Sequence, residues 1–374
     1  MSTAQVDPSA VEDPVLGSTP RFATTFARSW GSLVGIGVLA LALLVVAPAV
    51  LDEFRLNNLG KYCCWAIVAV GIGLSWGRGG MLVLGQGVFF AIGAYAMAMH
   101  LTLETTGEGG IPVFMILYDP LAPLPGFWVP FRSAAFTLAA IIVAPILVAS
   151  VLGFAIFKRR VKGAYFAILS QALAVALAYF IGGTIKLTGG DTGLSDFKSF
   201  FGYDLADPVN RRLIYSITAG LLVLCMLVVW QLYRSRFGEL LVATRDAEER
   251  VRFLGYDPAN IKLVAYVVSA VMASIGGAMF VPIVGIISPK EIGASASILL
   301  IAGVALGGRA SLFGPALGAI LLGYGRSTLS ERFENGWIYI LALMFIVVTL
   351  LLPDGLASVP RRLSRVVTSR RTAA

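Results

Sequence analysis

Long stretches without a charged side chain constrain this sequence more than any other feature. Three of them run from Gly31 to Leu51, from Gly79 to Leu103 and from Ser133 to Phe157. About 18 apolar residues in a row can cross the hydrocarbon core of a bilayer, and they must be helical because lipid offers the backbone no hydrogen-bond partner. Only 13% of the residues are charged, against roughly 25% in soluble domains. The sequence therefore predicts an all-α, polytopic transmembrane helical bundle.

The same pattern predicts about ten membrane spans. The region 294–330 is too long for one crossing and is interrupted by Gly307-Gly308-Arg309, so we expect two short spans or broken half-helices there. Its glycines favour close helix packing, with a helix break beside a cavity as the alternative. The remaining spans are expected at 31–51, 60–77, 81–103, 134–157, 162–183, 213–233, 261–284 and 337–352.

Basic residues predict the orientation of these spans. With the N terminus inside, 19 of the 29 Lys and Arg residues fall in segments on the inner side, which agrees with the excess of basic residues in cytoplasmic loops. We therefore expect a cytoplasmic N-terminal tail over 1–30, one transmembrane domain over 31–353 and a basic cytoplasmic tail over 354–374.

The side chains that catalysis or metal binding would need are sparse. His100 has no Cys, Asp or Glu company, and Cys63, Cys64 and Cys225 lie in apolar stretches typical of small buried residues. The sequence contains no G-x-x-x-x-G-K-[ST] phosphate loop, no H-E-x-x-H and no nucleophile elbow. We expect no catalytic residue, metal site or cofactor in this chain. The net charge of +8 reflects basic loops between spans rather than nucleic-acid binding.

Polar residues inside the predicted spans are the candidates for a substrate path. They are Gln86, Gln171, Ser170 and Ser75. None of them is charged, which suits a neutral polar ligand, since a charge near the bilayer centre costs at least about 2.5 kcal/mol. A carboxamide both donates and accepts hydrogen bonds. The alternative for each glutamine is a hydrogen bond between helices of the bundle.

The loop 234–260 is the most charged segment predicted for the cytoplasmic face. Apolar residues recur in it at spacings of three and four, and Gly255 followed by Pro258 supplies a stop, so we expect an amphipathic helix within 238–254. Its apolar side, including Leu241, Ala247 and Val251, needs a partner surface. The alternatives are the membrane surface and the bundle itself.

Six separated stretches resemble one protein family in the same order. They are GRGGMLVLGQGVFFAIGAYAMAM at 77–99, LTGGDTGLSDF at 187–197, FGELLVATRDAEERVRFLGYDP at 237–258, FVPIVGIISPKE at 280–291, ALGGRASLFGPALGA at 305–319 and LLPDGL at 351–356. The chain is similar to permeases of the branched-chain amino-acid and urea branch of ATP-binding-cassette importers. The resemblance implies that the loop 234–260 seats in an ATPase subunit. The residues that it marks for coupling are Gly238, Leu241, Arg245, Asp246, Ala247, Glu249, Arg250, Val251 and Gly255, with Arg245 and Arg250 at the polar rim.

Within that branch the sequence resembles the urea group most. Gln86-Gly87-Val88 stands where amino-acid permeases usually show a His-Ala-Ala type of triplet, and the chain is similar to the second, longer urea permease. This implies a bacterial inner-membrane importer with a second permease subunit, two cytoplasmic ATPases that hydrolyse ATP and a periplasmic substrate-binding protein. The alternatives are a permease for branched-chain amino acids or short amides, and an ATP-independent facilitator or channel.

Overall fold

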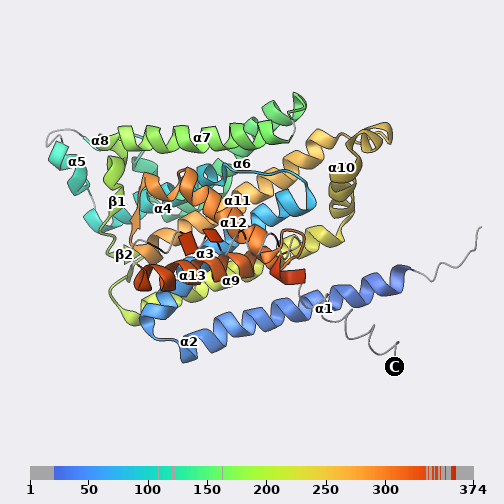
Figure 1. The fold of residues 1–374 in the computed structure, drawn as a ribbon. Coiled ribbons are helices and arrows are strands. Elements are labelled where there is room, and N and C mark those ends of the chain that lie inside the picture. Colours follow the sequence, from blue (N-terminus) through green and yellow to red (C-terminus); the bar gives the residue numbers. More distant parts are fainter. Residues whose placement is uncertain are drawn as a thin grey trace, which may run out of the picture.

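The computed structural model describes residues 21–107, 109–118, 123–161, 163–333 and 355–358 and single positions between 336 and 350, with side chains from Gly31 onward. Over these residues the chain is a helical bundle whose long helices run between the same two ends (Figure 1). Eight helical segments of the described chain are long and apolar enough to cross a membrane. The prediction of an all-α polytopic membrane protein is confirmed.

With the exception of the highly charged α10, the long helices follow the largely apolar stretches of the sequence. They are α1 (Arg21–Leu41), continued by the π-helical η2 (Ala42–Val46) and α2 (Ala47–Val50), α3 (Glu53–Ile72), continued by the π-helical η3 (Gly73–Arg78), α4 (Gln86–Thr106), α6 (Ala134–Lys158), α7 (Ala164–Gly183), α9 (Pro208–Arg234), α10 (Arg236–Phe253), α11 (Pro258–Val284), α12 (Ala294–Gly307) and α13 (Gly314–Arg332). Asp207 and Asp257 cap α9 and α11 by accepting hydrogen bonds from the backbone two residues on.

Helix α11 lies at the centre of the bundle, against α3, α4 and α6. Small residues make this packing possible. A Cβ on Gly93 would overlap the Ser274 carbonyl oxygen, and a Cβ on Gly277 would overlap that of Phe90. Because lipid is as apolar as the helices, association in a membrane depends on close packing of this kind rather than on burial from water.

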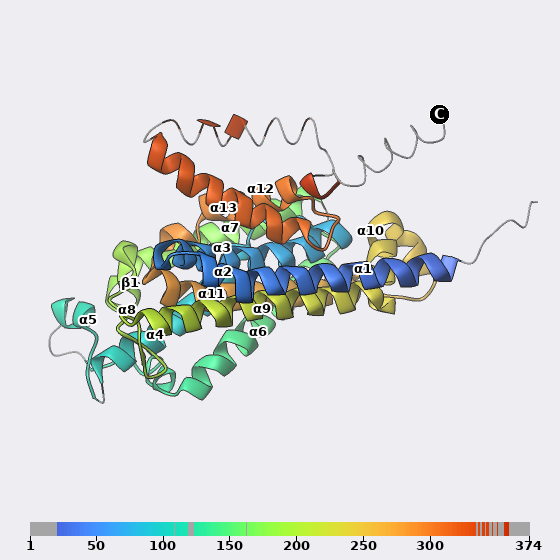
Figure 2. The ribbon, with the colours of Figure 1, turned by 90° about the horizontal axis from the view of Figure 1, so that it is seen from below.

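The two ends of the bundle differ in structure. At one end lie the short α5 (Val113–Tyr118), η4 (Val129–Arg132), α8 (Ile185–Thr188), η5 (Gly190–Thr192) and η6 (Pro289–Glu291), together with the paired strands β1 (Leu194–Ser195) and β4 (Ile286–Ile287), and β2 (Ser199–Phe200) and β3 (Tyr203–Asp204). The Glu104 carboxylate fastens this end by accepting hydrogen bonds from Ser199 Oγ at 2.6 Å and Phe201 N at 3.1 Å. Helix α10 lies at the opposite end, where α1 also begins (Figures 1 and 2).

Several predicted boundaries need correction. Residues 21–30 belong to α1 rather than to a loose tail. The third span does not begin at Met81, because the backbone of 80–85 is not helical and α4 starts at Gln86. The span expected at 162–183 starts at Ala164, and those expected from 60 and 213 begin earlier, at Glu53 and Pro208.

The predicted break in 294–330 is confirmed. Helix α12 ends at Gly307, α13 begins at Gly314, and Gly308 between them has φ +107°, a conformation that favours glycine. A Cβ on Gly307 or Gly318 would overlap backbone of the other helix, so the glycines serve both the break and the packing. Most of the last predicted span, 337–352, and the tails 1–20 and 359–374 lie outside the described residues.

Candidate functional site

Gln86 stands at the first position of α4, deep in the bundle. Its side chain is 1% exposed, and its Nε2 donates a hydrogen bond to Ser269 Oγ at 2.7 Å, near the middle of the 27-residue α11. No side chain caps this helix start, and Gln86 Oε1 is buried without a partner among the described residues. A buried helix N-terminus carries unpaired N–H groups and partial positive charge. The position therefore offers both donors and an acceptor inside the bundle.

Helix α7 reaches the same position from another side. Ser170 is buried, and its Oγ accepts a hydrogen bond from Leu84 N at 3.2 Å while donating to Ala167 O at 2.8 Å. Its neighbour Gln171 has a buried amide group whose nitrogen and oxygen have no partner among the described residues. The structure thus brings Ser170 to the residues just before Gln86, although they are far apart in the sequence.

In the part of the chain that the structure describes, Ser75 makes no hydrogen bond to the polar cluster formed by Gln86, Ser170 and Gln171. Its Oγ donates to Gly71 O at 3.0 Å within its own helix, and the side chain is fully buried. A hydroxyl that is bonded to the preceding turn satisfies the helix rather than a ligand. Among the described residues, the buried amide and hydroxyl groups without a hydrogen-bond partner include those of Gln86, Gln171 and Ser297, together with the Tyr95 hydroxyl.

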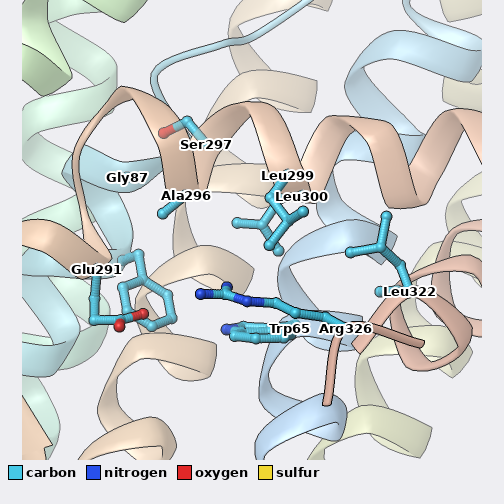
Figure 3. Close-up of a pocket in the computed structure, with 11 residues that line it drawn as sticks. Trp65, Gly87, Glu291, Ala296, Ser297, Leu299, Leu300, Leu322 and Arg326 are labelled. Atoms are coloured by element: carbon cyan, nitrogen blue, oxygen red, sulfur yellow. The ribbon is translucent and has the colours of Figure 1, made fainter. Parts of the chain in front are cut away.

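Ser297 belongs to a cavity between α3, α4, α12 and α13 that sequence reasoning missed. Gly87, Trp65, Glu291 and Arg326 also line it. Figure 3 shows the Arg326 side chain lying along the Trp65 ring, with its guanidinium directed toward Glu291, while Ser297 lies on the opposite side. The linear pattern does not indicate that η6 and the last turns of α13 line one cavity with α3.

Helix α10 confirms that the loop 234–260 contains a helix, but the residues exposed for a partner differ from those expected. Its backbone is non-helical at Ala247 (φ −151°, ψ 67°), which divides it into two short helices. Leu241 and Val251 are 0% and 3% exposed, and Gly238 is also buried. The expectation that a partner would cover Leu241 and Val251 is therefore wrong, since the chain's own bundle covers them.

Arg245 keeps 36% of its side chain exposed, and its guanidinium also bonds to the chain itself. Its Nη1 donates to Gly77 O at 2.8 Å, at the end of α3 and η3, and its Nε donates to Asp246 Oδ1 at 2.7 Å. The hydrogen bond between the two side chains raises the pKa of Arg245 and lowers that of Asp246. Both groups stay charged at neutral pH. Glu249 and Arg250 are exposed.

Three highly exposed apolar residues lie where α10 ends. Phe253 is 91% exposed, Leu254 75% and Tyr256 51%. Gly255 between them has φ +87°, which lets the chain turn sharply after the helix. We call these three side chains the α10 tip. The spacing rule did not single out Phe253 and Tyr256, because they do not continue the helical stripe.

Comparisons with known proteins agree with this architecture. Residues 54–352 match the family model described as "Branched-chain amino acid transport system / permease component". The high-affinity branched-chain amino acid transport system permease protein LivM of Salmonella typhimurium is 28% identical, over 88% of this chain and 77% of its own length. BraD of Pseudomonas aeruginosa, of the same description, is 24% identical over 81% and 94%.

Relatives with other printed substrates are also similar. The ribose import permease protein RbsC of Escherichia coli is 24% identical over 80% of this chain and 86% of its own length. No solved structure matches the chain. The family model covers most of the sequence, from the start of α3 onward. The chain therefore belongs to the family of permease components of branched-chain amino acid transport systems.

Proposed function

We propose that this chain is a membrane permease subunit of an ATP-driven importer, and that its substrate is urea. It would work with a second permease subunit, two ATPase subunits that hydrolyse ATP, and a substrate-binding protein on the outer side. The basic residues of the inner segments support placing α10 and both chain ends in the cytoplasm. Family membership supports the class of transporter.

The α10 tip supports an ATPase subunit as the partner at this end. Phe253, Leu254 and Tyr256 expose apolar surface next to the charged residues Glu249 and Arg250. Aromatic anchors surrounded by a polar rim are typical of residues that carry binding energy. In this proposal the tip enters the ATPase groove, and α10 connects it to α9 and α11.

The observation that carries the substrate proposal is the neutral polar cluster at the start of α4. Gln86 Oε1 is an unused acceptor, the uncapped N–H groups of α4 are donors, and Ser170 lies on the adjoining helix. Urea is neutral and offers amide donors and a carbonyl acceptor, so it can use such groups without bringing charge into the bundle. The resemblance of 85–99 to urea permeases supports the same substrate.

A branched-chain amino acid is the second candidate. The names of LivM and BraD favour it, and so does the cavity lined by Glu291 and Arg326, whose opposite charges suit the two ends of a zwitterion. The cluster at Gln86 contains no charged side chain to receive those ends. We therefore place urea first and amino acids or short amides second.

Uptake into vesicles tests the proposal. The assembled complex is reconstituted with ATP inside and given radiolabelled urea or leucine outside, together with the binding protein. We expect ATP-dependent accumulation of urea and none of leucine. Accumulation of leucine with no uptake of urea would replace the substrate. Uptake of urea that is indifferent to ATP and never exceeds equilibrium would instead favour a facilitator.

A further inference from the structure

The segment between η3 and α4 connects the α10 end of the bundle to the polar residues around Gln86. Residues 79–85 run from the α10 end of the bundle to Gln86 without helical structure after Gly79. We call this segment the 79–85 strap. Non-helical backbone at membrane depth is tolerated where protein buries it or a cavity adjoins it. Its two ends are attached to different elements.

At the α10 end the strap is attached to Arg245. The guanidinium donates to Gly77 O at 2.8 Å, directly before the strap. The aliphatic part of the same side chain packs on Gly80, which has φ +68° and where an added Cβ would lie 2.6 Å from Arg245 Cγ. Asp246 holds the guanidinium from its other side through Nε and Nη2, at 2.7 and 3.2 Å. One side chain of α10 therefore fits closely against the beginning of the strap.

At the other end the strap is attached to α7 and α11. Leu84 N donates to Ser170 Oγ at 3.2 Å, and Gln86 Nε2 donates to Ser269 Oγ at 2.7 Å. Gly85 packs so closely on α7 that a Cβ there would overlap the Ser170 carbonyl. Any displacement of the strap along its length reaches the polar cluster at Gln86.

Cavities adjoin the strap where it passes α10. One is lined by Gly77, Gly80, Arg245 and Arg309 among others, and a second by 79–82 together with residues of α6, α7, α10 and α11. Open space beside a short connection leaves it room to shift as a unit. Movements of packed elements in switching proteins need such space, because close-packed cores do not deform continuously.

We propose that Arg245 is the positioning residue that makes the 79–85 strap move with α10, so that displacement of α10 is delivered to the start of α4. This inference rests on the proposed function, in which an ATPase subunit moves α10. It assigns transmission to a route through the strap, in addition to the direct chain connections of α10 to α9 and α11.

The test compares transport with ATP hydrolysis in the complete reconstituted complex, with urea and leucine supplied in parallel. Arg245→Met removes the bond to Gly77, and Arg236→Met removes an exposed arginine at the start of the same helix as a matched control. We expect Arg245→Met to retain ATPase association and basal hydrolysis. Substrate moved per ATP should fall about tenfold or more, within the range of typical coupling energies. Arg236→Met should keep the wild-type ratio.

A crosslink tests the same contact independently. A Cβ on Gly80 would lie 3.4 Å from Arg245 Cβ, at the short end of the separation that a disulfide spans. The pair Gly80→Cys with Arg245→Cys should be uncoupled when reduced and regain substrate moved per ATP when oxidised. The native Cys63, Cys64 and Cys225 are buried and should not interfere.

Several results would overturn the inference. They are a wild-type ratio in Arg245→Met, loss of ATPase association in that variant, failure of the pair to crosslink, and an oxidised pair that is less active than the reduced one. The last would mean that α10 and the strap separate during the cycle. A wild-type complex whose uptake ignores ATP would instead contradict the proposed function itself, so the two failures can be told apart.

Discussion

Phe253 gives the sharpest prediction about the ATPase interface. A Phe side chain buries about 150–250 Å² when fully covered, and 91% of this one is exposed. At about 25 cal/mol per Å² of apolar surface, complete burial of this exposed part corresponds to about 3–6 kcal/mol. Docking covers only part of a residue and orders it, so we expect Phe253→Ala to cost about 2 kcal/mol, the size of an interface hot spot. That cost corresponds to roughly 30-fold weaker association.

Titrating the purified ATPase against the permease in nanodiscs measures this affinity. Phe253→Leu is the matched control, because it keeps an apolar side chain and should lose only a small part of the affinity. Leu241→Ala is the opposite control. That side chain is 0% exposed, so its loss should reduce the amount of folded permease rather than the affinity of what remains. Unchanged affinity in Phe253→Ala would refute the reasoning and favour a tip that lies on the membrane surface.

Three further predictions concern the bundle. Gln86→Leu should weaken urea uptake several-fold, because it removes the unused acceptor. Ser75→Ala should transport normally, because the Ser75 hydroxyl is bonded within its own helix. If the two variants have the same KM for urea, Gln86 does not belong to the substrate path. Gly277→Ala should sharply reduce the yield of monodisperse protein in detergent, because the new Cβ would overlap the backbone of α4. Gly220→Ala should not, because a Cβ at Gly220 would face open space. Equal yields of the two variants would contradict this packing. Asp257→Asn should lower the thermal midpoint equally at pH 7 and pH 5. The Lys158 ammonium donates a hydrogen bond to the Asp257 carboxylate and lowers its pKa in the fold, so the contribution disappears only as pH falls below about 4. A difference that vanishes at pH 5 would contradict the assignment.

The candidate substrate site was predictable in part. Gln86, Gln171 and Ser170 stood out because polar groups are rare in apolar spans, and the structure brings Ser170 to the start of α4. Their role in a substrate path stays a prediction. Ser75 has the same sequence signature, but its hydroxyl is used within its own helix. Glu291 and Arg326 could not be found, because their shared cavity joins elements that are distant in the sequence.

For the loop 234–260, too, the sequence predicted the helix but not its surroundings. The spacing of apolar residues predicts a helix within 238–254 and which of its sides is apolar, and the structure has the helix at Arg236–Phe253. It does not predict what covers that side. In the structure the bundle covers Leu241 and Val251, which leaves the α10 tip exposed and turns Arg245 toward Gly77.

By itself the sequence determined the class of this protein. Uncharged stretches of spanning length admit only helices in lipid, and the family motifs indicated the permease family. The tertiary structure alone decided that α4 starts at Gln86, that a non-helical strap precedes it, and that Arg245 meets this strap. The physical reason is that hydropathy depends on each residue's own transfer to lipid, whereas a helix start or a buried hydrogen bond depends on which distant backbone lies beside it. In this chain glycines allow that approach, and their partners are defined only in three dimensions.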